Sequence, residues 1–285
     1  MRTEKREAIE EMRRTCQPVN KMDPAPAINR IFYRRLSFLF TRILIRTNVT
    51  PNQVTWFWGL LMMISSLLFL FDSPILTVLG AIGWIVGFSL DCTDGEIARY
   101  KKKTSKRGLF LDLVNHSLTF PALFICLGIG VFFSGFGHVG TSASGVIGYM
   151  ADGIYPATGD FNSLFFGCLA GIAIVLVMII PELYNSVQPE EGLLRGRSQA
   201  VEGQLFSRPG TYKLIRDFNP LTFMNLFFVL LGFAVLNLVH SIGWLPFQPD
   251  ILWIHGWMPL FLFLYAMGYS AALAVRIIIL YRRLN

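Results

Sequence analysis

The sequence predicts an all-α integral membrane protein, and three observations lead to this fold class. Of 285 residues, 53% are AVILMFWYC and only 15% are charged, whereas about a quarter of a water-soluble domain is charged. The mean hydropathy is +0.51. Apolar runs of roughly 20 residues, the length that crosses about 30 Å of hydrocarbon, recur along the chain. Together these observations exclude an ordinary cytosolic enzyme, a disordered chain and a disulfide-stapled secreted module.

The N-terminal segment is the first element that the sequence defines. Residues 1–50 are too polar for a signal peptide, so we expect a cytoplasmic segment followed by a six-helix membrane domain at 51–285. Residues 27–46 place arginines among apolar residues at near-helical spacing, which predicts an amphipathic juxtamembrane helix in the membrane interface. These arginines are Arg30, Arg34, Arg35, Arg42 and Arg46. They either anchor the helix at the cytoplasmic surface or bind an anionic substrate.

Six apolar runs follow this segment. The predicted transmembrane helices span residues 53–71, 75–99, 109–134, 161–182, 220–240 and 254–281. All 25 Lys and Arg residues lie before the first run, at the junction of the second and third, between the fourth and fifth, or near the end of the sixth. By the positive-inside rule, both termini are therefore cytoplasmic. The net charge of +7 thus indicates membrane lipids as partners, and no nucleic acid is expected.

Ionisable residues inside the predicted helices gather at one junction. The end of the second helix and the start of the third contain Asp91, Asp94, Arg99, Asp112 and His116. Charged groups within a membrane cost about 2.5 to 3.5 kcal/mol each on insertion scales and mark functional sites. Asp91 and Asp94 share one stripe of their helix, as do Asp112 and His116, because their spacing is three or four residues. A helix hairpin can bring these two stripes face to face.

Converging carboxylates need a cation, because like charges a few Å apart repel strongly in a low-dielectric site. Oxygen ligands favour Mg²⁺ or Mn²⁺, which bind through carboxylates together with substrate phosphates. Two such ions about 4 Å apart are a recurring arrangement for phosphoryl displacement. Gly95 and Ala98 are small enough to let a nucleotide approach the helix, and Arg99 can bind a phosphate or a carboxylate.

The spacing of these residues resembles the signature of the CDP-alcohol phosphotransferase family. The chain contains Asp91-x2-Asp94-Gly95-x2-Ala98-Arg99-x8-Gly108-x3-Asp112-x3-His116, and the family signature is D-x2-D-G-x2-A-R-x8-G-x3-D-x3-D. Seven of the eight fixed positions match, and the signature crosses the second and third of six helices, as in the family. The stretch TNVTPNQVT is similar to the family's entry to the first helix. Outside residues 47–121 the resemblance is one of topology.

The resemblance implies a membrane enzyme, usually a homodimer, that works with Mg²⁺ or Mn²⁺ and two ions in its site. Such enzymes transfer a substituted phosphate from a CDP-linked donor to an alcohol and release CMP. By position, the metal ligands would be Asp91, Asp94, Asp112 and His116, and CDP would bind against Gly95, Ala98, Arg99 and Gly108. Asp112 and His116 would be catalytic, in an active site at the cytoplasmic face.

His116 is the one departure from the signature, because the family has its last Asp there. That Asp is assigned as the base that deprotonates the acceptor hydroxyl, and in some members as a ligand of the second metal. A neutral imidazole can take both roles. It contributes one negative charge fewer, so the second ion would bind more weakly or the site would work with one ion. Two other interpretations stay open: His116 only hydrogen-bonds the substrate, or transfer activity has been lost.

The substrates are also open. In phospholipid biosynthesis, the donor would be CDP-diacylglycerol attacked by a polar alcohol, or a CDP-linked headgroup attacked by a lipid alcohol. The same chemistry could act on a soluble CDP-polyol or CDP-sugar, and a non-catalytic CDP-binding membrane protein is the third possibility. Arg107 and Arg216 are the first choices for binding a phosphorylated acceptor or a lipid headgroup, although basic loops also follow from the positive-inside rule alone.

Overall fold

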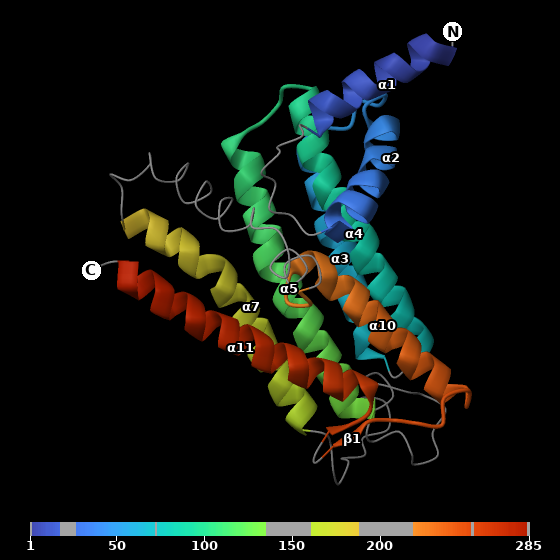
Figure 1. Cartoon of the computed structure of the whole chain (residues 1–285), viewed down its shortest axis with the longest axis vertical. Coiled ribbons are helices and arrows are strands. Elements are labelled where there is room, and N and C mark those ends of the chain that lie inside the picture. Colours follow the sequence, from blue (N-terminus) through green and yellow to red (C-terminus); the bar gives the residue numbers. More distant parts are fainter. Residues whose placement is uncertain are drawn as a thin grey trace. The chain divides into compact units, whose positions relative to one another are not determined.

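The computed structural model of the chain describes residues 2–17, 27–71, 73–134, 161–187, 219–251 and 254–283. Among these residues, six helices are long and apolar enough to cross a membrane, as predicted. They are α3 (Pro51–Leu67), α4 (Pro74–Tyr100), α5 (Lys106–Ser134), α7 (Phe161–Val187), α10 (Phe223–Ser241) and α11 (Trp257–Arg283) (Figure 1). A 3-10 turn at Leu68–Leu70 extends α3. The predicted all-α, multi-pass fold class is confirmed, whereas the cytoplasmic position of the termini stays a prediction.

Two further helices precede the first span. They are α1 (Arg2–Cys16) and α2 (Arg34–Leu44), and a π-helical turn at Asn29–Tyr33 leads directly into α2. The helix predicted over 27–46 is therefore confirmed, and it exposes the apolar side chains of Ile31, Leu39 and Ile43. Its location in the membrane interface and the domain boundary after residue 50 stay predictions. The sequence pattern did not reveal α1, because that segment is mostly charged and has no apolar run.

The segment before α11 contains the one pair of β-strands in the described part of the chain. Strand β1 (Asp250–Ile251) pairs with β2 (Ile254–His255) in antiparallel register. Each strand has two residues, so this pairing leaves the fold class unchanged.

The chain forms two compact units, and α3, α4, α5 and α10 contribute residues to both. Unit 1 comprises Met1–Leu60, Val86–Asn115 and Pro189–Asn225. Within it, the buried ring of Tyr33 packs edge-to-face on Phe88, with 4.9 Å between the ring centroids. The Tyr33 hydroxyl donates to the carbonyl of Met224 at 3.1 Å. This tyrosine thus ties the start of α2 to α4 and to the first turn of α10.

Unit 2 comprises Leu61–Ile85, His116–Gln188 and Leu226–Asn285. Its core is aromatic. Trp84 stacks on Phe227 with 5.1 Å between ring centroids and meets Phe120 edge-on at 5.5 Å. The indole Nε1 of Trp84 donates to the Ser66 hydroxyl at 3.1 Å, which satisfies its one polar atom inside the core.

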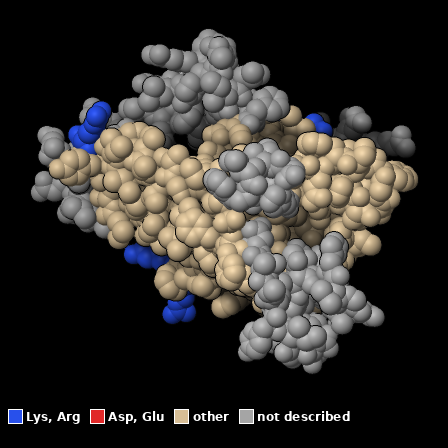
Figure 2. Space-filling view, turned by 90° about the horizontal axis from the view of Figure 1, so that it is seen from below, with Lys and Arg blue, Asp and Glu red and all other residues tan. Residues whose placement is uncertain are grey.

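Charged residues are sparse in the described part of unit 2. They are Glu182, Asp250, Arg276, Arg282 and Arg283. Figure 2 shows one face of the molecule, on which the described surface exposes no Asp or Glu and only scattered Lys or Arg. The three aspartates of the signature, by contrast, all belong to unit 1.

Arg276 is a charged residue within the α11 span, and the structure gives it a partner. Its Nη1 donates to the main-chain carbonyl of Val177 in α7 at 2.6 Å. Pro181 lies inside α7, four residues after Val177, and it has no N–H to donate to that carbonyl. The guanidinium therefore takes the place of a missing helical hydrogen bond and ties α11 to α7.

Candidate active site

The first turn of α3 is fixed by a capping box. The backbone N–H of Thr50 donates to Gln53 Oε1 at 2.8 Å, and the backbone N–H of Gln53 donates to Thr50 Oγ1 at 3.4 Å. Pro51 suits the first helical position, because the N–H there would have no partner within the helix. This cap sets the direction from which Asn52 and Thr55 reach the site.

Helix α4 ends in a Schellman motif. The N–H of Lys103 donates to the carbonyl of Ala98 at 2.9 Å, and the N–H of Lys102 donates to that of Arg99 at 3.3 Å. Lys102 adopts the left-handed conformation, with φ of 51°. The motif turns the chain back so that the loop after α4 returns directly into α5.

That loop is fixed at both sides. Lys101 Nζ donates to the carbonyls of Thr47 and Val49 at 2.9 and 2.8 Å, which holds the loop against the segment before α3. The Ser105 hydroxyl accepts a hydrogen bond from the N–H of Gly108 at 3.0 Å, so Ser105 is the N-cap of α5. The hairpin expected from the sequence is therefore formed.

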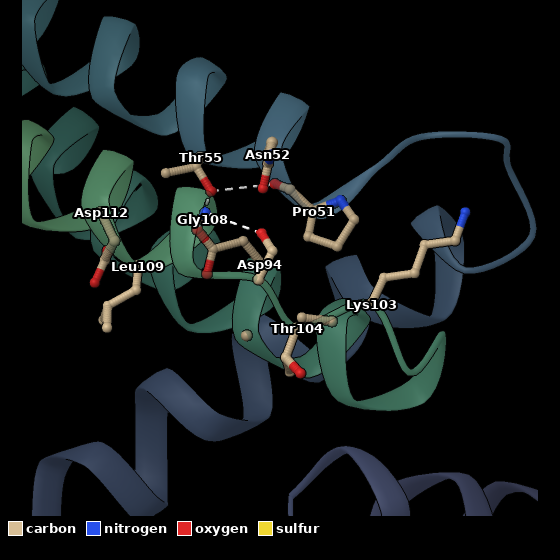
Figure 3. A pocket seen from close by; sticks show the side chains of 12 residues that line it. Pro51, Asn52, Thr55, Asp94, Lys103, Thr104, Gly108, Leu109 and Asp112 are labelled. Atoms are coloured by element: carbon tan, nitrogen blue, oxygen red, sulfur yellow. Dashed lines mark hydrogen bonds between the residues drawn. The ribbon is translucent and has the colours of Figure 1, made fainter.

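A cavity of about 240 Å³ lies within unit 1, among the ends of α3, α4 and α5 (Figure 3). Its lining comprises Pro51, Asn52, Thr55, Asp94, Gly95, Ala98, Lys103, Thr104, Ser105, Gly108, Leu109 and Asp112. Five of these residues occupy fixed positions of the signature: Asp94, Gly95, Ala98, Gly108 and Asp112. In the view of Figure 3, Asp112 and Lys103 lie on opposite sides of the cavity.

Asp94 is held in one orientation by two donors from α3. The hydroxyl of Thr55 donates to Asp94 Oδ2 at 2.6 Å, and the indole Nε1 of Trp58 donates to the same oxygen at 2.9 Å. Figure 3 shows Thr55 and Asp94 pointing toward one another. Both donors are almost completely buried. Their geometry is that of groups that orient a carboxylate ligand from behind.

Asn115 fixes the distance between α3 and α5. Its side-chain Nδ2 donates to the carbonyl of Thr55 at 2.8 Å. Gly59 makes this approach possible, because a Cβ on that residue would lie only 2.5 Å from Asn115 Nδ2. Helix α3, which donates hydrogen bonds to Asp94, is thus attached to α5, which contains Asp112.

Asp91, Asp112 and His116 form a group that could hold a metal ion. One ligand atom from each residue lies within 4.8 Å of the other two. Asp112 and His116 are one turn apart on the uninterrupted helix α5, so helix geometry fixes their spacing. Two carboxylate oxygens and an imidazole nitrogen suit a small divalent cation. Asp94 lies outside this group, and its predicted role as a ligand stays a prediction.

Arg99 is not among the residues that line the described cavity. Its Nε donates to the main-chain carbonyl of Cys16, at the end of α1, at 2.8 Å. A Cβ placed on Gly95 would lie 3.3 Å from Arg99 Nη1 and 3.7 Å from Nη2. The guanidinium therefore covers Gly95, and Gly95 itself lines the cavity.

The cations of the basic loop have different positions. Lys103 lines the cavity, whereas Arg107, the first choice from the sequence, is absent from the described lining. Arg216 lies outside the described residues. The sequence offered no reason to separate Lys103 from its neighbours, because the Schellman turn that directs it depends on backbone conformation.

Thr55 and Trp58 are site residues that the sequence reasoning missed. They are polar groups three residues apart in the first span, so they lie on one helix face. Thr55 also ends the stretch TNVTPNQVT that resembles the family. That coincidence of a polar stripe with a family-like stretch is the signal that could have identified them.

The fold and this site define a multi-pass membrane protein whose second and third spans carry an acidic, metal-compatible hairpin beside a cavity. Residues 48–151 match the family model described as CDP-alcohol phosphatidyltransferase. This match, over about a third of the chain, confirms the resemblance seen in the signature, and the matched family is one of transferases. Comparison with curated proteins finds no match.

Proposed function

We propose that this protein transfers a substituted phosphate from a CDP-linked donor to an alcohol acceptor and releases CMP, with a divalent metal ion. The donor would be CDP-diacylglycerol or a CDP-linked headgroup, and the pathway would be phospholipid biosynthesis at the cytoplasmic face. One observation carries the proposal: five fixed positions of the signature line a single cavity. The family domain over residues 48–151 supports phosphatidyl transfer in general.

The residues present fit a metal ion. The ligand atoms of Asp91, Asp112 and His116 converge within 4.8 Å, and oxygen-rich sets of this kind suit Mg²⁺ or Mn²⁺. Asp94 lines the adjoining cavity and would complete the set. A bound ion would supply charge neutralisation for the phosphate groups, whether one or two ions bind.

The side chains would divide the remaining work. A ring nitrogen of His116 would take the proton of the acceptor hydroxyl, and the hydroxyl oxygen would form a bond to the donor's β-phosphorus. The bond between that phosphorus and the oxygen bridging to CMP would break, and the electron pair would leave with CMP. Gly95, Ala98 and Gly108 leave space for the nucleotide against the helices. Thr55 and Trp58 keep Asp94 oriented throughout.

A CMP-release assay tests the proposal. The purified full chain in detergent is given Mg²⁺ or Mn²⁺ and CDP-diacylglycerol, CDP-linked headgroups or soluble CDP-polyols, with and without acceptors. Release that requires a lipid partner supports the proposed function, and EDTA should abolish it. Release with wholly soluble pairs would favour the soluble-substrate alternative. CDP binding without release from any pair would favour a non-catalytic CDP-binding protein.

Substitutions of His116 separate its possible roles. His116→Asp restores the family residue and should retain activity, because a carboxylate can also accept the proton of the acceptor hydroxyl. His116→Asn keeps hydrogen bonding but cannot accept the proton, so release should fall by about 10² or more. Full activity of His116→Asn would show that His116 only hydrogen-bonds the substrate.

A further inference from the structure

A buried carboxylate lies within the signature stretch of α4 at a position that the signature leaves variable. Glu96 is completely buried and accepts three side-chain hydrogen bonds. Its donors are Gln17 Nε2 at 2.6 Å, Ser37 Oγ at 2.7 Å and Thr41 Oγ1 at 2.6 Å. All three come from the N-terminal segment, so these hydrogen bonds to Glu96 attach that segment to α4.

Glu96 and the cavity residues lie on different faces of α4. Successive residues of an α-helix are about 100° apart, so Glu96 points about 200° away from Asp94. Asp94, Gly95 and Ala98 line the cavity. Thr93, on the same side as Glu96, donates its hydroxyl to the carbonyl of Ser37 at 3.3 Å. The N-terminal segment therefore packs behind the residues that form the cavity wall.

Arg99 connects the two faces. Its Nε donates to the carbonyl of Cys16, the residue next to Gln17. Gln17 also donates to the carbonyl of Arg34 at 2.7 Å, so it joins the end of α1 to both α2 and α4. The terminal nitrogens of Arg99 lie over Gly95 on the cavity wall. The hydrogen bond from Gln17 to Glu96 thus fixes the position of the neighbouring Cys16 carbonyl. That carbonyl in turn accepts a hydrogen bond from the Arg99 guanidinium.

We propose that Gln17 and Glu96 are positioning residues: their hydrogen bond seats the end of α1 on α4, so that the Cys16 carbonyl holds the Arg99 guanidinium over Gly95 for contact with the donor's diphosphate. The inference rests on the proposed function. An arginine side chain has several rotatable bonds and loses much conformational entropy when its guanidinium is fixed. Fixing its Nε in advance leaves the two terminal NH₂ groups to bind phosphate oxygens. The N-terminal helix, which lies outside the family match, thereby contributes to donor binding.

The test uses a charge exchange at the contact. Gln17→Glu places two carboxyl groups against each other and should displace the end of α1 from α4. Gln17→Glu with Glu96→Gln exchanges the two groups and restores the hydrogen bond between positions 17 and 96, but not the bond to the Arg34 carbonyl. Thr15→Glu is the matched control, because it adds the same charge two residues away at an exposed position. Each full-length variant is titrated with CDP in Mg²⁺ and assayed for KM of the donor and of the acceptor.

We expect Gln17→Glu to weaken CDP binding and raise the donor KM about tenfold, as for one misplaced hydrogen bond to a charged group. The acceptor KM should stay the same, and the double exchange should recover part of the loss. Thr15→Glu should bind CDP as the wild type does. Equal losses of donor and acceptor affinity, or no recovery in the double exchange, would overturn the proposal in favour of a purely structural contact.

A second cycle asks whether the effect passes through Arg99. In an Arg99→Ala background, Gln17→Glu should cause less than a twofold further loss of CDP affinity, because the group being positioned is gone. A full tenfold loss in that background would overturn the proposal. Failure of the proposed function is seen in the wild-type chain, which would then release no CMP, and the result that matters here is a wild-type chain that also fails to bind CDP. That result would overturn both proposals, whereas normal wild-type binding that Gln17→Glu leaves unchanged would overturn only this one.

The thiol of Cys16 reports the seating independently of any substrate. Cys16 is completely buried in the structure, and burial, followed by the charge of Glu96, raises its pKa to about 11. Both factors slow its reaction with maleimide, since the thiolate is the nucleophile. Peptide mapping after a maleimide pulse should find Cys16 protected in the wild type and in the double exchange, and labelled in Gln17→Glu. Protection in all three would contradict the unseating on which the proposal depends.

Discussion

The two units of the protein satisfy their buried polar groups in opposite ways. Unit 1 surrounds its carboxylates with side-chain donors: three for the buried Glu96 and two for the half-buried Asp94. Unit 2 is packed from aromatic rings around Trp84, and its Arg276 is satisfied by a main-chain carbonyl. In unit 1, neutral side chains donate hydrogen bonds to carboxylates. In unit 2, a charged side chain donates to a main-chain carbonyl that lacks its helical partner.

The difference shows where function would be found. Burying a carboxylate is expensive and rarely improves on an apolar residue for stability alone. A chain that needed only six packed helices would have no reason for the acids of unit 1. Arg276 carries the same cost, but Pro181 explains it locally. Intramembrane charge therefore marks a functional site only after structural explanations of this kind have been examined.

The largest effect that distinguishes the units should come from Asp94→Asn. The change keeps size and shape but removes the negative charge, so a metal-dependent transfer should lose about 10³-fold or more in CMP release. The fold should survive, because an amide oxygen can still accept from Thr55 and Trp58. Thermal unfolding measured beside CMP release checks both statements. A variant with normal turnover would remove Asp94 from the site.

Thr55→Val should have the next largest effect on activity. It removes one of the two donors to Asp94, and loss of such an orienting group typically costs 10- to 100-fold in metal affinity or activity. Thr77→Val is the matched control in unit 2. Thr77 is also buried, and its hydroxyl donates to the main-chain carbonyl of Ser73, just before the start of α4. The half-saturating Mn²⁺ concentration should rise in the first variant and not in the second. Equal values for the two would indicate that orientation of Asp94 is unimportant.

Unit 2 should respond to Arg276→Leu through stability. The part-buried carbonyl of Val177 would lose its donor, at a cost of about 1 kcal/mol for a lost hydrogen bond to a charged group that is not fully buried. Adding Pro181→Ala should recover much of this loss, because alanine restores the helical N–H. Unfolding in mixed micelles for the two single variants and the double variant gives the coupling energy. Strictly additive losses would contradict the role assigned to this arginine.

Much of this comparison could be predicted from the sequence. The six spans follow from apolar length alone, and the hairpin follows from two polar stripes separated by a short basic loop. Of the three aspartates in the signature, Asp94 and Asp112 line the cavity, whereas Asp91 is not among its lining residues. The spans and the hairpin depend on the helix repeat and on chain length, both of which are local properties.

The rest depended on contacts between distant segments. Nothing in the sequence pairs Gln17 with Glu96, because 79 residues separate them and α1 has no apolar periodicity. Likewise, Arg276 and Pro181 look like unrelated exceptions in two apolar helices until the packing of α11 on α7 joins them. Lys103 was indistinguishable from the other loop lysines, since its place at the cavity is set by the left-handed backbone of Lys102.

Lys102 provides the smallest expected effect, and it lies at the helix end beside the site. A lysine in the left-handed region carries a steric cost that glycine avoids, and C′ of a Schellman motif is the usual place for glycine. Lys102→Gly should therefore stabilise the protein by up to about 1 kcal/mol, partly offset by the greater freedom of glycine in the unfolded chain. Its side chain does not line the cavity, so CMP release should stay at the wild-type level.

Lys102→Ala is the control, because it removes the same charge without relieving the backbone strain. Comparing the unfolding curves of Lys102→Gly and Lys102→Ala isolates the contribution of backbone conformation to the free energy of unfolding. If both variants change stability equally, charge is responsible, and the turn that directs Lys103 to the cavity is unstrained.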